Sequence, residues 1–161
     1  MAMITYEQAH SELREAGEAF DRLTSAVGLA EVDRAWREFL SALERSWTKV
    51  HARLKHHPRY PAWIASHETV RKRDPLLAYV RTARSAAEHS LGAVTRDADT
   101  DPFQAHLARL PSIKNQGVTF HPPTSHLGQP VDPRNIVEVA RKALTWYEQF
   151  VRAAENEYFS T

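Results

Sequence analysis

The sequence predicts an all-α fold, a bundle of four to five helices in up-and-down order. Apolar residues recur every three or four positions over several long stretches, which is the period of a helix with one buried face. Aspartate followed by proline precedes two of these stretches, a combination typical of helix starts. The chain has 161 residues, 42% of them hydrophobic, enough for one buried core. We therefore expect a single helical domain over residues 1–161.

The two longest apolar patterns cover residues 5–27 and 30–57, and Gly28 separates them. Their apolar stripes comprise Tyr6, Ala9, Leu13, Ala16, Phe20, Leu23 and Val27 in the first, and Val32, Trp36, Phe39, Leu43, Trp47, Val50 and Leu54 in the second. Two long stripes joined by so short a turn predict an antiparallel helical hairpin. Pro58 and Pro61 follow, and residues 62–73 form either a short helix or a turn-rich segment.

Residues 74–92 are expected to form the next helix, with Asp74 as its N-cap, Pro75 at its first position and Gly92 at its end. The face predicted to be buried includes Leu76, Leu77, Val80 and Ala83. The last helix is expected to begin in the same way, with Asp132 as its N-cap and Pro133 at its first position. Its apolar stripe runs from Ile136 to Tyr158.

An insertion of about residues 92–132 separates these helices, and its five prolines exclude a long helix there. Residues 112–114 and 118–121 flank Asn-Gln-Gly, which predicts a small β-hairpin. His106, His121 and His126 also lie in the insertion, but their spacing matches no established metal-ligand pattern, so we expect exposed loop histidines. The insertion either covers the apolar stripe as a lid or walls a small-molecule pocket.

Charge is unevenly distributed, although the net charge is only +1. Between Lys49 and Arg84 there are nine basic and two acidic residues, a local charge of +7. Such a stretch either binds an anion such as RNA or is a solvated face that balances acidic neighbours. The candidate nucleic-acid-binding residues are Lys49, Arg53, Lys55, Arg59, Arg71, Lys72 and Arg73.

Several classes of function are excluded or disfavoured. The chain has no cysteine, so disulfides, thiol nucleophiles and cysteine metal sites are excluded. No apolar run approaches the roughly 20 residues that span a bilayer, and no signal-peptide pattern is present. No phosphate-binding glycine loop or nucleophile elbow occurs. We expect a cytoplasmic protein without membrane association, metal or cofactor.

The helix over residues 74–92 carries the most suggestive chemistry. Histidine transfers protons near neutral pH, and arginine presents a planar, permanently charged fork that matches phosphate oxygens. His89 and Arg84 together would suffice to cleave RNA without metal, with the 2′-hydroxyl of the RNA as nucleophile. Ser85 would hold the imidazole or the substrate, and Glu88 would orient Arg84 or Arg81. A five-residue separation is a rotation of about 140° on a helix, so Arg84 and His89 do not share a face. Either the helix frays near Glu88, or a second copy completes the site in a two-fold dimer.

The segment Leu77-Ala-Tyr-Val-Arg-Thr-Ala-Arg-Ser-Ala-Ala-Glu-His89 resembles the motif helix of the HEPN superfamily, whose signature is an arginine, a polar residue and, after a short gap, a histidine. The resemblance implies a small helical bundle acting as a dimeric, metal-independent ribonuclease, with Arg84 and His89 catalytic and Ser85 as polar partner. It also implies toxin–antitoxin or phage-defence systems, and an antitoxin or other protein as partner. Ser85 departs from the family, in which this position is most often asparagine, aspartate or histidine.

Two alternatives remain at this point. The chain also contains Arg45-Ser-Trp-Thr-Lys-Val-His51, which satisfies the same loose spacing in the middle of a helix. We prefer Arg84 and His89 because they lie near the C-terminus of a capped helix. The alternative function is a non-catalytic helical module for dimerisation or protein interaction, in which Arg84 and His89 are ordinary surface residues.

Overall fold

The structure, a computed structural model, describes residues 3–87 and 112–159. Its helices are α1 (Met3–Ser25), α2 (Leu29–Leu54), α3 (Tyr60–Arg73), α4 (Pro75–Ala87) and α6 (Ile136–Phe159). Two short antiparallel hairpins precede α6, β1 (Ile113–Asn115) with β2 (Val118–Phe120), and β3 (Ser125–His126) with β4 (Gln129–Pro130). The all-α bundle with a small β insertion is therefore confirmed.

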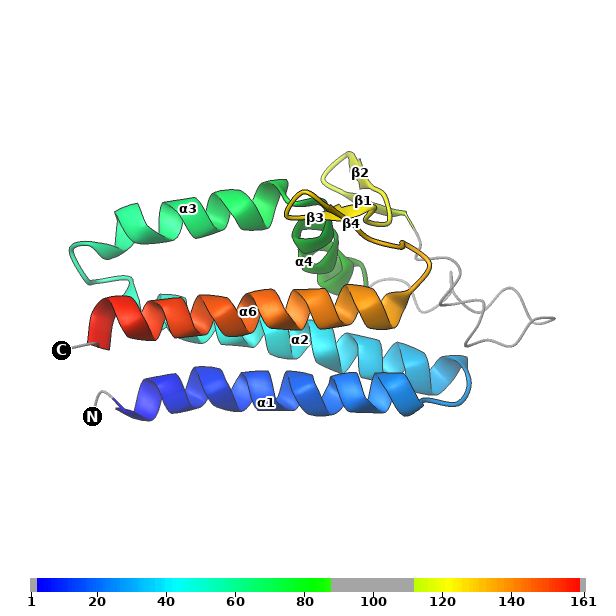
Figure 1. Ribbon diagram of the computed structural model, residues 1–161, viewed down its shortest axis with the longest axis horizontal. Helices are drawn as coiled ribbons and strands as arrows, with labels where there is room; N and C mark the ends of the chain where they lie inside the picture. Colours follow the sequence, from blue (N-terminus) through cyan, green and yellow to red (C-terminus); the bar gives the residue numbers. More distant parts are fainter. Residues whose placement is uncertain (1–2, 88–111, 160–161) are drawn as a thin grey trace.

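The helices α1, α2 and α6 lie side by side, and α3 runs above α6 in the view of Figure 1. The α1–α2 pair is the expected antiparallel hairpin. The helix α4 is seen nearly end-on, so it crosses the long helices instead of running alongside them (Figure 1). No described helix combines the length and apolar character needed to cross a membrane.

The core follows the apolar stripes of the sequence closely. All seven predicted positions of α2 are buried, as are Leu76, Leu77, Val80 and Ala83 of α4. One prediction is wrong. Val27 is 81% exposed, because α1 ends at Ser25 and the connection to α2 turns outward through Gly28, whose φ is 89°.

The starts of α4 and α6 differ from each other. Asp74 caps α4 as predicted, with the Leu77 amide donating to Asp74 Oδ2 at 3.0 Å. The predicted cap at Asp132 is wrong, because Asp132 closes a separate turn by accepting the Arg134 amide at 2.9 Å. The α6 cap is Asn135, whose Oδ1 accepts the Glu138 amide at 3.0 Å.

The Asp74 carboxylate also fixes the second hairpin to the α3–α4 corner. Its Oδ2 lies 2.8 Å from His126 Nδ1, and its Oδ1 accepts the Leu127 amide at 2.7 Å. Both acid and imidazole are buried, so the expectation that His126 is an exposed loop histidine is wrong. Burial is tolerated because each polar group has the other as partner.

The first hairpin forms where the sequence predicts it, with Ile113 paired to Phe120 and Asn115 to Val118. Gln116 and Gly117 both have positive φ, 49° and 80°, as a tight hairpin turn requires. Residues 103–110, and Gly92 as the predicted end of the helix that begins after Asp74, lie outside the described residues.

Replacing Asp74 with alanine should lower the free energy of unfolding by about 3 kcal/mol, because it leaves the buried donors at Leu77 and His126, and the partly buried amide of Leu127, without their acceptor. Urea unfolding measures this. The matched control is Asp132→Ala, which removes an exposed turn acceptor and should cost less than about 1 kcal/mol. Equal losses in the two variants would contradict the role assigned to Asp74.

Alkaline pH should destabilise the fold. Burial raises the pKa of Tyr6 to about 12, and raises the pKa of Tyr60, Tyr79 and Tyr147 as well. Between the unfolded pKa of about 10 and these higher values, the folded chain binds more protons than the unfolded chain, so raising the pH favours unfolding. Melting temperature should therefore hold up to about pH 9 and fall above about pH 10. The phenolate absorbance of the folded protein reports the ionisation of its tyrosines. If all of them ionise near pH 10 while the protein stays folded, the prediction is wrong.

Candidate functional site

The described part of the predicted site is the outer end of α4, where Arg81 and Arg84 lie three residues apart and therefore on neighbouring positions of one helix face. Both side chains are half-buried. Neither forms an ion pair with a carboxylate of the described residues, and the buried Nε of Arg84 has no hydrogen-bond partner there. Burial raises the pKa of Tyr147, and the guanidinium groups of Arg71 and Arg81 act on that pKa in the opposite direction.

A half-buried guanidinium without a counterion is costly, because the protein removes water from the charge and supplies no acceptor in return. Two guanidinium groups on one face, both without a carboxylate partner in the described part of the chain, suit a ligand with several anionic oxygens, such as a phosphodiester. His89 and Glu88 lie outside the described residues, as does the side chain of Ser85. The geometry between Arg84 and His89 thus stays a prediction.

The predicted basic surface is divided by the structure. Lys49 and Arg53 lie on α2, Lys55 and Arg59 in the connection that follows it, and Lys72 and Arg73 at the far end of α3. Fourteen residues of helix separate the two ends of α3, about 20 Å. These six side chains are half-buried or exposed, and none forms an ion pair with a described carboxylate.

Arg71, the seventh predicted member, does not face solvent. It is 7% exposed, and its guanidinium lies 4.3 Å from the centre of the Trp47 ring. Its Nε donates to the Tyr147 hydroxyl at 3.0 Å, and its Nη2 pairs with Glu44. The helical spacing that places Trp47 and Tyr147 in the core was visible in the sequence, but nothing marked Arg71 as their partner.

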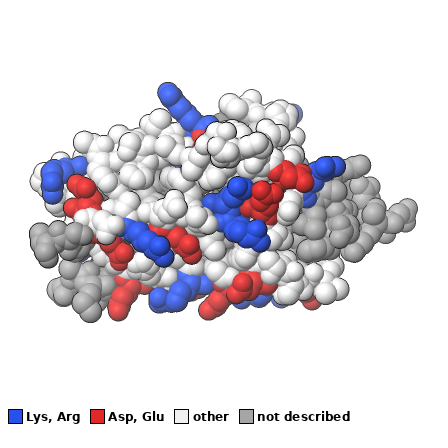
Figure 2. Space-filling model, in the orientation of Figure 1, with Lys and Arg blue, Asp and Glu red and all other residues white. Residues whose placement is uncertain are grey.

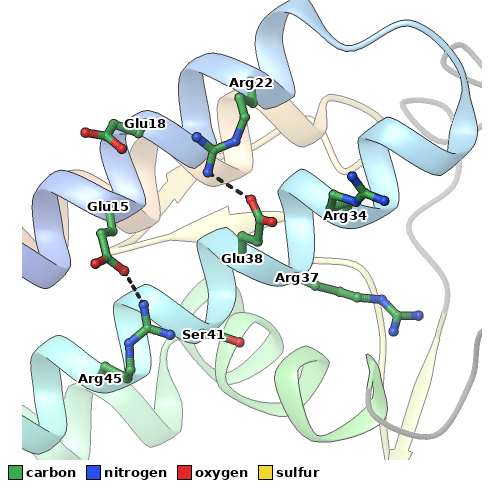
Figure 3. A pocket seen from close by; sticks show the side chains of 8 residues that line it. All are labelled: Glu15, Glu18, Arg22, Arg34, Arg37, Glu38, Ser41 and Arg45. Carbon is green, nitrogen blue, oxygen red and sulfur yellow. Dashed lines mark hydrogen bonds and ion pairs between the residues drawn. The ribbon is translucent and has the colours of Figure 1, made fainter.

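The other basic cluster lies in an open groove of about 690 Å³ between α1 and α2 (Figure 3). Here the charges neutralise one another. Arg45 binds Glu15 at 2.6 Å, and Arg22 binds Glu38 at 2.8 Å (Figure 3). Arg45 also binds Glu12 at 2.6 Å. Arg37 extends away from α1 and lies 3.0 Å from Asp33. With three of its four arginines paired, this groove is a poor site for a phosphate chain.

Arg45 and His51, the second pair in the sequence with the motif spacing, each have a structural partner. Arg45 is held by two carboxylates of α1, and His51 Nδ1 lies 3.1 Å from the Tyr60 hydroxyl. Both residues thus have partners within the fold.

The histidines of the insertion do not form a metal centre in the described chain. His121 lies 3.2 Å from the Ser112 hydroxyl, and His126 is paired with Asp74. Over residues 3–87 and 112–159, no three His, Asp or Glu side chains converge as metal ligands do. His106 lies outside these ranges.

Comparison with protein-family models, with curated proteins and with solved structures gives no match for this chain. The class of protein defined by the fold is thus a helical bundle with a β insertion, and its function is inferred from the residues alone.

Replacing Arg71 with methionine should lower the free energy of unfolding by about 3 kcal/mol. Glu44 loses its ion-pair partner, and the Trp47 ring loses the guanidinium that packs on it. Adding Glu44→Gln should restore part of that loss. The matched control is Arg73→Ala, an exposed neighbour on the same helix, which should change stability by less than about 0.5 kcal/mol. Chemical denaturation compares them. If Arg71→Met is as stable as wild type, the structural role assigned to Arg71 in the core is wrong.

Proposed function

We propose that the protein is a HEPN-like, metal-independent endoribonuclease that acts as a cytoplasmic homodimer, with Arg84 and His89 as the cleavage pair. The observation that carries the proposal is the half-buried Arg81 and Arg84 pair, which lacks carboxylate partners among the described residues. Ion-paired arginines elsewhere, such as Arg22 and Arg45, show that the chain does supply counterions where a guanidinium has a structural role.

The proposed reaction is transfer of the phosphodiester to the adjacent 2′-oxygen. The 2′-hydroxyl loses its proton to His89 and attacks phosphorus, and the bond from phosphorus to the 5′-oxygen breaks. The leaving 5′-oxygen takes a proton from solvent water and His89 releases its proton to solvent, which yields a 2′,3′-cyclic phosphate and a 5′-hydroxyl end. Arg84 stabilises the negative charge that builds up on the phosphoryl oxygens, where a charged hydrogen bond is strongest.

The remaining predicted residues have supporting roles in this proposal. Arg81 binds a neighbouring phosphate, Ser85 holds the imidazole or the substrate, and Glu88 orients an arginine. Lys72 and Arg73 stand at the α3 end that joins α4, and in this proposal they bind further phosphates of the RNA. A two-fold dimer brings two such helices into one cleft, and an antitoxin-like protein would restrain the activity of a toxin or phage-defence enzyme.

The test is incubation of the purified protein with mixed cellular RNA in the presence of chelator, followed by analysis of the fragment ends. Wild type should produce cyclic phosphate ends. Arg84→Ala and His89→Ala should each reduce the rate by about a hundredfold or more, because each removes a group that acts in the transition state. The matched control is Arg34→Ala, an exposed α2 arginine, which should cleave like wild type.

Two results would count against the proposal. If folded wild type yields no cyclic phosphate ends, the non-catalytic helical interaction module becomes the better interpretation. If Arg84→Ala retains the wild-type rate while its fold is intact, the cleavage belongs to another site.

A further inference from the structure

The first hairpin presents an unpaired strand edge at the surface. Its strands β1 and β2 are antiparallel, and Lys114 lies opposite Thr119 in their register. Ile113 of β1 is buried in the core. On β2, Val118 and Thr119 are exposed and Phe120 is half-buried. In Figure 1 β2 is the outer strand of the hairpin, and over the described residues no strand other than β1 pairs with it.

The backbone groups at the centre of this edge belong to Thr119. Gln116 and Gly117 form a two-residue turn, and the two residues that flank such a turn form a hydrogen-bonded pair. Opposite residues of an antiparallel ladder alternate between hydrogen-bonded and non-hydrogen-bonded pairs, so the next pair, Lys114 and Thr119, exchanges no hydrogen bond. The amide and the carbonyl of Thr119 therefore point away from β1. They offer one donor and one acceptor to a strand that adds to the edge.

The side chains around the edge are apolar or uncharged. β2 consists of Val-Thr-Phe, without the lysine or proline that commonly protects an exposed strand from pairing. Lys114 is the only Lys, Arg, Asp or Glu between residues 112 and 131, and Figure 2 shows a largely uncharged surface over the hairpins. Val118 is 56% exposed, and Val118 and Leu127 are two of the three exposed large apolar side chains of the described chain. Exposed apolar side chains beside an unpaired strand edge indicate a surface for strand addition.

The strand β2 is complementary to a second copy of itself. In an antiparallel pair centred on Thr119, each Val118 lies opposite the Phe120 of the other copy, and the two Thr119 residues lie opposite each other. Aromatic with β-branched and threonine with threonine are both favourable cross-strand pairs. The two Thr119 residues also exchange two backbone hydrogen bonds, because each supplies an outward amide and an outward carbonyl. The pairing brings no like charges together on β2.

We infer that β2 joins two copies of this chain into a continuous four-stranded antiparallel sheet, with a two-fold axis at Thr119. The axis is perpendicular to the sheet, so the inner faces of both hairpins lie on the same side of it. Ile113 is buried and α4 contacts both strands, so the two α4 helices lie against one joined sheet. The inference rests on the homodimer of the proposed function, and it names the surface through which the copies pair.

The experiment is sedimentation velocity of the full chain over a range of concentrations, with circular dichroism to check folding. Wild type should form a dimer. Thr119→Lys and Thr119→Glu should each raise the dimer dissociation constant by about tenfold or more, because like charges then lie opposite each other at the axis. A mixture of these two variants should dimerise again, because opposite charges then meet. The matched control is Gln129→Lys, which adds the same charge at an exposed position of the second hairpin and should dimerise like wild type.

Thr119→Pro is a further variant, in case the charged variants do not fold. It removes the outward amide, which makes no bond to β1, and should also weaken the dimer. The inference is overturned if wild type is monomeric, if the folded Thr119 variants dimerise like wild type, or if the mixed variants stay monomeric. Cleavage is scored separately. Arg84-dependent cleavage by a dimer that the Thr119 variants leave intact would overturn the inference alone, and a Thr119-dependent dimer that cleaves no RNA would overturn the nuclease alone.

Discussion

The interaction on which the arrangement depends is the buried carboxylate of Asp74. A single side chain caps α4, pairs with His126 and holds the Leu127 amide. These contacts join the α3–α4 corner to the second hairpin, although 52 residues separate the acid from the histidine. They also fix the start of α4, and hence the position of Arg81 and Arg84 two to three turns further along that helix. Leu127 has a positive φ of 49°, an unfavourable conformation for leucine, and its amide is anchored by the same carboxylate.

The arginines of the described chain serve two distinct purposes. On the α1–α2 face most are neutralised by carboxylates across the helix pair, and Arg71 is neutralised in the core by Glu44. From the end of α2 through α4, the remaining cations have no such partners among the described residues. The sequence alone does not distinguish the paired arginines from the unpaired ones, because Arg71 and Arg73 belong to the same basic stretch. The second set is free to bind an external anion, as far as the described residues show.

Aromatic side chains hold α3 on α6. Trp63 contacts Phe150 at 5.8 Å and Tyr158 at 5.7 Å. His67, one turn further along α3, contacts both Trp63 and Phe150. Packing of rings therefore fixes the position of α3 over α6.

The sequence by itself determined the helices α1, α2, α4 and α6, the α1–α2 hairpin, the first β-hairpin and the capped start of α4, because these depend on local signals such as apolar period, Asp-Pro and a glycine turn. It left residues 62–73 open between a short helix and a turn-rich segment, and the structure shows the helix α3 there. It determined neither the α6 cap nor the second hairpin. Asp132 and Asn135 are both good caps, and Leu127-Gly128 is a weak turn signal. The pairing of Asp74 with His126 and the burial of Arg71 were decided by tertiary structure alone, because they join residues distant in the chain whose partners no local pattern specifies.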